Sequence, residues 1–238
     1  MVPLHRQITS TNTLDMTRIV VLGTGTDIGK THASIAITAA LADSGIPTAA
    51  LKPIESGVSL HATTDASSLA AVSSIPIKPQ PYAFPDPVSP HLAARRTAVT
   101  IDFDRITRWI DSHLARVVLV ETAGAMLSPL NRDRTNLDLA RTLKPDVLLL
   151  VAPDRLGALH DVNAALHALR TLAPELPRPT LLLQPPASPD SSTGTNADEI
   201  AWLGIAPKPH VFPRAKPTDR TTREAARALL AEWRLLHA

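Results

Sequence analysis

The chain contains no cysteine, few aromatic residues and no long apolar run. The absence of cysteine excludes disulfides, thiol nucleophiles and cysteine-ligated zinc, and it is typical of the reducing cytoplasm. Aromatic residues make up only 3% of the sequence, too few for a base-stacking surface, so we expect no nucleic acid partner. No apolar stretch reaches the length of a membrane span, and we therefore expect no membrane partner and a cytoplasmic location.

The 238 residues have a formal net charge of +2 and suffice for one α/β domain with a substantial core. Residues 1–15 lack a continuous apolar segment, so we do not expect them to be a signal peptide. We expect residues 1–15 to be a disordered N-terminal extension and residues 16–238 to be a single domain. The nine histidines include no pair with the spacing of metal ligands on a recognisable strand or helix, so we expect no histidine-bound metal.

Short apolar segments alternate with segments of helical pattern. The expected strands are Arg18–Leu22, Thr48–Leu51, Val117–Val120, Val147–Val151 and Thr180–Leu183. The expected helices are Lys30–Asp43 (ended by Ser44-Gly45), a short helix from about Asp65, His91–Arg96, Phe103–Leu114 (capped by Thr100 or Asp102), Asn136–Leu143, Leu159–Leu172 and Thr221–His237. Prolines cluster in Ile75–Pro90 and Leu176–Pro189, which indicates that these segments are mainly loops rather than helices or strands. The alternation predicts an α/β fold with a mostly parallel sheet and helices on both faces.

A glycine-rich loop follows the first strand and precedes the first helix. Residues 23–31 read Gly-Thr-Gly-Thr-Asp-Ile-Gly-Lys-Thr, with five residues between Gly23 and Gly29 where the common phosphate-binding motif has four. Such a loop turns its backbone N–H groups toward phosphate oxygens, while Lys30 reaches the β- and γ-phosphates and Thr31 binds Mg²⁺. We therefore predict a P-loop NTPase-like fold. The expected ATP contacts in this segment are Thr26, Asp27, Ile28, Gly29, Lys30, Thr31 and His32.

Two further strand ends bear chemically useful groups. Because ligands bind at the carboxyl ends of parallel strands, Glu121 can hold Mg²⁺ opposite the Thr31 hydroxyl. Lys52 follows the second strand and is either a site cation or a solvated charge; its position alone does not decide between them. Asp65, taken by itself, fits a helix N-terminus as well as it fits a metal site.

Four segments together resemble the ATP-dependent dethiobiotin synthetase family. They are the long phosphate loop 23–31, Lys52-Pro-Ile-Glu-Ser-Gly57, Asp65-Ala66, and Pro81-Tyr-Ala-Phe84-x-x-Pro87-x-Ser89-Pro-His91. They occur in the family's order over the first half of the chain, and the match weakens beyond Leu130. The last segment is the most specific, since phosphate loops occur in many families.

The resemblance implies a reaction and a set of residues. Family members carboxylate one amine of 7,8-diaminononanoate with CO₂, phosphorylate the carbamate with ATP, and close the cyclic urea with release of phosphate. The resemblance makes Lys30 and Lys52 catalytic, Ser56 a substrate contact, and Thr31, Asp65 and Glu121 the Mg²⁺ ligands. It also implies that Asp65, Glu121, Gly124 and Gln184 contact ATP, and that the protein is a homodimer.

The sequence departs from the family pattern at a few positions. His160 stands where the family has an asparagine that holds the diamine across the dimer interface, so we expect His160 to contact this substrate. Ala125 replaces a glycine after Glu121, Gln184 stands near the usual adenine-reading asparagine, and Asp27 stands where the family often has glutamate.

Three other functions compete with this interpretation. A nucleotide-switch ATPase of the partitioning kind would have an extra lysine early in the phosphate loop, and residues 24–28 contain none. A glutamine-dependent amidotransferase would need a cysteine nucleophile. A related ATP-binding protein that acts on another substrate stays possible because of Ala125 and His160.

Overall fold

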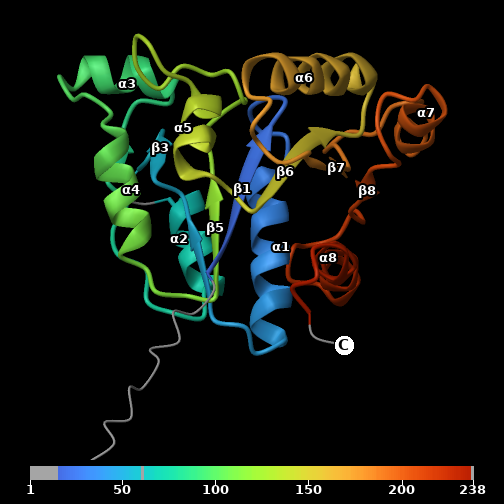
Figure 1. Cartoon of the computed structure of the whole chain (residues 1–238), viewed down its shortest axis with the longest axis horizontal. Helices are drawn as coiled ribbons and strands as arrows, with labels where there is room; N and C mark the ends of the chain where they lie inside the picture. Colours follow the sequence, from blue (N-terminus) through green and yellow to red (C-terminus); the bar gives the residue numbers. More distant parts are fainter. Residues whose placement is uncertain (1–15, 60–61, 237–238) are drawn as a thin grey trace, which may run out of the picture.

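The computed structural model describes residues 16–59 and 62–236 (Figure 1). The extension expected at residues 1–15 lies outside the described residues. Six strands form the main sheet: β1 (Thr17–Gly23), β2 (Thr48–Leu51), β5 (Val117–Glu121), β6 (Val147–Pro153), β7 (Thr180–Gln184) and β8 (His210–Val211). Their order is β2-β5-β1-β6-β7-β8, and every pairing between them is parallel. The predicted parallel sheet is therefore confirmed.

Helices cover both faces of this sheet, as predicted (Figure 1). The helices are α1 (Lys30–Asp43), α2 (Asp65–Val72), α3 (Pro90–Arg96), α4 (Phe103–Asp111), α5 (Asn136–Leu143), α6 (Ala158–Leu172), α7 (Asn196–Trp202) and α8 (Arg220–Glu232). On one face, alternate residues of the central strands pack against α4, α5 and α6. On the other face, the intervening residues pack against α1 and α8.

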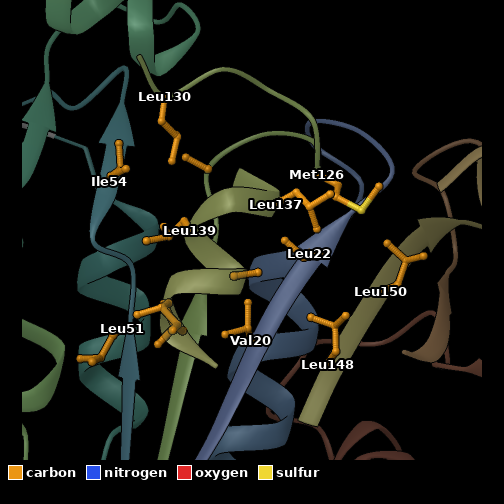
Figure 2. Packing of buried hydrophobic residues seen from close by; sticks show 14 of the residues in the cluster. Val20, Leu22, Leu51, Ile54, Met126, Leu130, Leu137, Leu139, Leu148 and Leu150 are labelled. Carbon is orange, nitrogen blue, oxygen red and sulfur yellow. The ribbon is translucent and has the colours of Figure 1, made fainter. Parts of the chain in front are cut away.

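The larger apolar cluster shows how the sheet is buried. Val20 and Leu22 of β1 and Leu148 and Leu150 of β6 point to the same side, where Leu137 of α5 packs over them (Figure 2). All five side chains are at most 3% exposed. Residues at alternate positions of a strand share one face, so strands covered on both faces must be apolar at every position. This is why short runs without polar residues predicted these strands.

The structure corrects several expected boundaries. The proline-rich segment Ile75–Pro90 is not all loop, because β4 (Tyr82–Phe84) pairs in parallel with β3 (Ile54–Ser56) in a separate two-stranded sheet. A three-residue strand shows no periodicity and is detectable only through its partner. Helix α4 ends at Asp111 rather than Leu114, and α8 ends at Glu232 rather than His237 because Arg234 adopts a left-handed φ of 55°.

Helix α7 and strand β8 were not among the expected elements. Other details are confirmed. Helix α1 has its predicted bounds and ends at Ser44 and a left-handed Gly45, and the side chain of Asp102 caps α4 by accepting from the Asp104 amide. Within residues 16–59 and 62–236, no helix has the length and apolar character to cross a bilayer.

The fold brings the carboxyl ends of β1, β2, β5, β6 and β7 to one edge of the sheet. The chain leaves β1 into the loop that precedes α1, leaves β2 at Lys52, and leaves β5 directly after Glu121. All three are adjacent strands in the order β2-β5-β1. Three segments far apart in the sequence therefore meet at this edge, and this arrangement builds the site.

Candidate active site

The loop between β1 and α1 has the backbone conformation of a phosphate-binding turn. Asp27 and Gly29 have positive φ angles of 56° and 89°, and α1 begins at Lys30. Aspartate is among the residues that adopt this conformation most readily. A Cβ at Gly29 would lie 3.0 Å from Cγ of Gln184, so a side chain there would be both strained and crowded. The loop therefore needs glycine at this position.

Lys30 is folded back over this loop. Its Nζ donates to the carbonyl oxygen of Gly25 at 3.1 Å, and the residue is only 6% exposed. Burial lowers the pKa of Lys30 to about 8, with the nearby Lys52 lowering it further and Glu121 opposing the shift. The carboxylates near Lys30 offset the effect of burial only in part, and an anion entering the loop would supply further negative charge.

Glu121 lies at the centre of the site and is fully buried. Its Oε1 accepts hydrogen bonds from Thr31 Oγ1 at 2.7 Å and from Lys52 Nζ at 2.9 Å. Its Oε2 has no hydrogen-bond partner in the described part of the chain. An unpaired carboxylate oxygen in a buried position is costly unless a cation or donor completes it. The Thr31 hydroxyl beside it is a second hard oxygen donor.

Lys52 links Glu121 to Asp65. Its Nζ pairs with Asp65 Oδ2 as well as with Glu121, and the side chain is 8% exposed. Burial by itself lowers the pKa of Lys52, but the attraction of Glu121 and Asp65 outweighs burial and raises the pKa above its usual value. Lys52 is therefore not the solvated charge that its sequence position allowed; it is a buried cation between two carboxylates.

These groups face one cavity of about 310 Å³. The lining residues are Thr26, Asp27, Gly29, Lys30, Thr31, Lys52, Glu55, Ser56, Asp65, Glu121, Ala123 and Gly124. A second cavity of about 440 Å³ shares Thr26, Asp27 and Gly29 with it. The other residues of the second cavity are Ile28, His32, Pro153, Arg155, Gln184, Pro185, Pro186, Ala187, Arg214 and Ala215. The two cavities are therefore neighbours that meet at the glycine-rich loop.

The second cavity has two polar features. His32 Nε2 hydrogen bonds to the carbonyl oxygen of Ala215 at 2.8 Å, which ties α1 to the chain before α8. Gln184 is 4% exposed, and its Nε2 is buried with no partner among the described residues. An unpaired buried amide beside an open cavity is a donor suited to a ligand that presents an acceptor.

The site fits Mg²⁺ by its donor chemistry. Glu121 Oε2, the Thr31 hydroxyl and the half-exposed Asp65 carboxylate are oxygen donors, the type that Mg²⁺ prefers with several retained waters. This set contains two carboxylates and one hydroxyl. In the part of the chain that the structure describes, no site is built from three or more His, Cys, Asp or Glu side chains.

Known proteins show strong similarity to this chain. A family model described as "AAA domain" matches residues 17–200. ATP-dependent dethiobiotin synthetase BioD of Methylobacterium nodulans is 33% identical over 202 residues, covering 78% of this chain and 88% of that protein. The protein of the same name from Frankia casuarinae is 34% identical over 204 residues, covering 83% of this chain and 84% of that protein. The chain belongs to the ATP-dependent dethiobiotin synthetase family.

Solved structures of other proteins share the fold. A chain of the MinC:MinD cell division protein complex of Aquifex aeolicus superposes with a TM-score of 0.57 at 12% identity, covering 91% of this chain and 96% of that one. A ParA family ATPase from Chlorobium tepidum gives 0.54 at 14% identity, covering 92% of both chains. At these identities the likeness concerns the fold alone, and it confirms the predicted P-loop α/β architecture.

Most residues expected from the resemblance to dethiobiotin synthetases converge. Residues from the phosphate loop, Lys52, Ser56, Asp65, Glu121 and Gly124 line the first cavity, and Ile28, His32 and Gln184 line the second. His160 is different: it is exposed in the first turn of α6 and lines neither cavity. Its contact with substrate stays a prediction.

Ala125, which departs from the family pattern, also lies outside the first cavity, although Ala123 and Gly124 line it. Asn136 is fully buried and donates to the carbonyl oxygens of Ala123 at 2.6 Å and Ala125 at 2.8 Å. These bonds, and a φ of 79° at Gly124, fix the course of the loop after β5.

Sequence reasoning missed Glu55, Arg155 and Arg214 as cavity residues. Glu55 lies within the Lys52–Gly57 segment, in which the family resemblance assigns roles to Lys52 and Ser56 alone. Arg155 lies two residues after the end of β6, at the edge of the sheet where ligands bind in parallel α/β folds. Arg214 lies in a distant segment, and its guanidinium donates to the carbonyl oxygen of Ala187 at 2.5 Å. That contact depends on folding and has no local signal.

Proposed function

We propose that the protein is a dethiobiotin synthetase, which uses ATP and CO₂ to convert 7,8-diaminononanoate into dethiobiotin, ADP and phosphate. The decisive observation is that a second buried lysine, Lys52, faces the same cavity as the phosphate-loop lysine and contacts the same carboxylate as Thr31. The second ammonium comes from the end of β2, outside the phosphate loop. A reaction in which phosphate passes between two anions needs such a second cation.

The reaction proceeds in three balanced steps. One amine of the diamine attacks CO₂ and loses a proton, which gives a carbamate. A carbamate oxygen then attacks the γ-phosphorus of ATP, and ADP leaves with its bridging oxygen. The second amine attacks the carbonyl carbon of the resulting mixed anhydride and loses a proton, and phosphate leaves as the cyclic urea closes.

The two lysines neutralise the negative charge of the groups that react in these steps. Lys30, at the start of α1, supports the transferring phosphoryl group together with the N–H groups of the loop. Lys52 approaches from the end of β2 and can neutralise the carbamate and the γ-phosphate together. Both ammonium groups are already fixed and desolvated, so little reorganisation accompanies the movement of charge.

We propose that Thr31, Glu121 and Asp65 hold Mg²⁺ when nucleotide binds. The ion would neutralise phosphate charge and free Lys52 from part of its pairing with the two carboxylates. Gln184 and the second cavity would receive the adenine, with the unpaired Nε2 donating to a ring nitrogen. Ser56 lines the first cavity beside Lys52 and would contact the diamine.

The proposal includes a homodimer acting in the cytoplasm. His160 is exposed on α6, and the neighbouring Leu156 is 75% exposed. A second copy placed against this surface would bring His160 to the diamine bound in the partner subunit. An ATP-consuming synthetase with no cysteine suits the cytoplasm.

The test is release of ADP from the purified protein, measured with and without bicarbonate and with and without the diamine. We expect ADP release to depend on both, with dethiobiotin as the product. Lys30→Ala and Lys52→Ala should each abolish turnover, and Lys52→Ala should retain most of the ATP affinity because its main contribution is to the transition state. An equal rate of ADP release with and without the diamine and bicarbonate would contradict the proposal.

One alternative has specific support. His160 in place of the asparagine is compatible with a related enzyme that uses the same ATP site for another amine. In that case ADP release would remain low with 7,8-diaminononanoate but would rise with a diamine of different length. His160→Asn would then increase turnover of 7,8-diaminononanoate, whereas it should not do so if the proposed substrate is the natural one.

A further inference from the structure

Glu55 is a buried carboxylate in the first cavity that the proposed reaction does not use. It lies on β3 and is 8% exposed. Its Oε1 accepts from the amide of Asp65 at 2.7 Å, and its Oε2 accepts from the amide of Ala66 at 3.1 Å. Gln80 Nε2 also donates to Oε2 at 3.4 Å. Both carboxylate oxygens are therefore directed at the N-terminus of α2.

Helix α2 already has a complete local cap. Thr64 Oγ1 accepts from the Ser67 amide at 3.0 Å, and Ser67 Oγ accepts from the Thr64 amide at 3.0 Å. This capping box satisfies the third amide of the helix and leaves the first two for Glu55. Thr64 thus determines the residue at which the helix begins. Glu55, ten residues before Asp65, determines the position of this helix end relative to β3.

The first residue of α2 is the one that contributes to the site. Asp65 pairs with Lys52, and its side chain is 44% exposed, so packing alone does not hold it. Its amide is anchored by Glu55 on one side, and its carboxylate meets Lys52 on the other. An Asp65 carboxylate held this way is preorganised, because its backbone cannot shift without breaking the Glu55 hydrogen bond.

We propose that Glu55 is a positioning residue that holds Asp65 in place for Lys52 and Mg²⁺, an inference that rests on the proposed function. A carboxylate suits this role because it only accepts hydrogen bonds, and its charge is favourable at a helix N-terminus. Glutamine of the same size would keep one acceptor and turn an NH₂ group toward a backbone N–H. Glu55→Gln should therefore loosen Asp65 without emptying the volume of the site.

The experiment measures ADP binding to the full chain by calorimetry at a series of Mg²⁺ concentrations and again in EDTA. Mg²⁺ should increase the ADP affinity, and the Mg²⁺ concentration that gives half of this increase is the quantity compared. Glu55→Gln should raise that concentration by about tenfold or more, as for other residues that orient metal ligands. Its ADP affinity in EDTA should equal that of wild type. Asp65→Asn should show the same Mg²⁺ shift, and Glu55→Gln combined with Asp65→Asn should add nothing further.

Thr64→Ala is the matched control, because it removes the other cap of the same helix. It should lower the Tm by roughly 2–4 °C, as expected for one lost cap, while leaving the Mg²⁺ dependence unchanged. Equal Mg²⁺ shifts in Thr64→Ala and Glu55→Gln would show that Glu55 only stabilises α2, and would overturn the inference. A further loss on adding Glu55→Gln to Asp65→Asn would overturn it too, because Glu55 would then act on the ion directly.

The wild-type measurements separate this inference from the proposed function. If Mg²⁺ strengthens ADP binding but diamine-dependent turnover is absent, the synthetase proposal fails and the role of Glu55 is still decided by the variants. If Mg²⁺ has no effect on wild-type ADP binding, Asp65 is not a metal residue and the inference about Glu55 is wrong.

Discussion

The Lys52–Glu121 pair allows a quantitative test of the site's electrostatics. Glu121 is fully buried, and its Oε1 is shared by Lys52 and Thr31. Lys52→Met removes the ammonium and keeps most of the volume of the side chain. Among the described residues, the buried carboxylate then keeps the neutral Thr31 hydroxyl as its side-chain donor.

The expected loss follows from burial. Removing one partner of a buried ion pair typically costs about 3–5 kcal/mol, because the other charge is left uncompensated. The Asp65 arm adds little, at most about 1 kcal/mol, because that carboxylate is half-exposed and can be hydrated. We therefore expect Lys52→Met to lower the free energy of unfolding by at least about 3 kcal/mol. For a chain of this size that is a fall in Tm of roughly 6–12 °C.

Glu121→Gln should cost less, about 1–3 kcal/mol, because Lys52 keeps Asp65 as a partner. The double variant has neither the buried carboxylate nor the buried ammonium. Its loss should therefore be smaller than the sum of the two single losses by about 2 kcal/mol, as expected for residues in direct contact.

The assay is urea unfolding at pH 7.5 in EDTA without nucleotide, so that neither Mg²⁺ nor ATP compensates the charges. Activity is not a useful readout here, because each single variant removes a proposed catalytic or metal residue. If the two losses add to within about 0.5 kcal/mol, Lys52 and Glu121 are not energetically coupled, and the electrostatic account of the site is wrong.

Two further predictions concern positions outside this pair. His113 is 2% exposed, and burial lowers its pKa below the usual 6.5. Its Nδ1 donates to the carbonyl oxygen of Trp109, and its Nε2 accepts from the Lys78 amide. Below about pH 6.5 the unfolded chain binds a proton that the folded chain does not, so stability is full above this pH and decreases as the pH falls. His113→Gln should flatten that decrease in urea midpoints between pH 7 and 5, and an unchanged pH profile would contradict the assignment. Gly29→Ala and Gly45→Ala both place a side chain at positive φ, at a cost of about 1 kcal/mol each, but only Gly29→Ala also meets Gln184 and should abolish ATP binding in calorimetry. Equal ATP affinity in the two variants would argue against the phosphate loop.

Local sequence patterns predicted those helices, strands and loops whose defining residues are close together in the sequence. Helix α5 has the bounds expected from its sequence because Thr135 and Asp138 form a capping box at its start and Leu137, Ala140 and Leu143 lie on one buried face. Strands β1 and β5 were recognisable because both faces of the sheet are covered, so the buried stretches Ile19–Leu22 and Val117–Val120 contain only apolar residues. The phosphate loop was recognisable because its glycines and its lysine are adjacent in the sequence.

The separate pairing of β3 with β4 could not be predicted in this way. Each strand has three residues, and β4 lies among prolines, so neither has a periodic pattern. Their pairing is a contact between residues about 28 positions apart, Ile54 with Tyr82, that forms only when the intervening chain has folded. The same holds for Glu55, whose role depends on the position of α2.

The sequence by itself determined the order of the five longer strands and most helices, the phosphate loop, and which strand ends would bear Lys52 and Glu121. These features follow from periodicity, turn chemistry and residue type, which act over a few neighbouring residues. Only the tertiary structure decided that Lys52 is a buried cation shared by two carboxylates, that one Glu121 oxygen lacks a partner among residues 16–59 and 62–236, and that Glu55 accepts from the Asp65 amide. The physical reason is that charge, burial and hydrogen bonding at a site depend on distances between segments, and folding sets those distances.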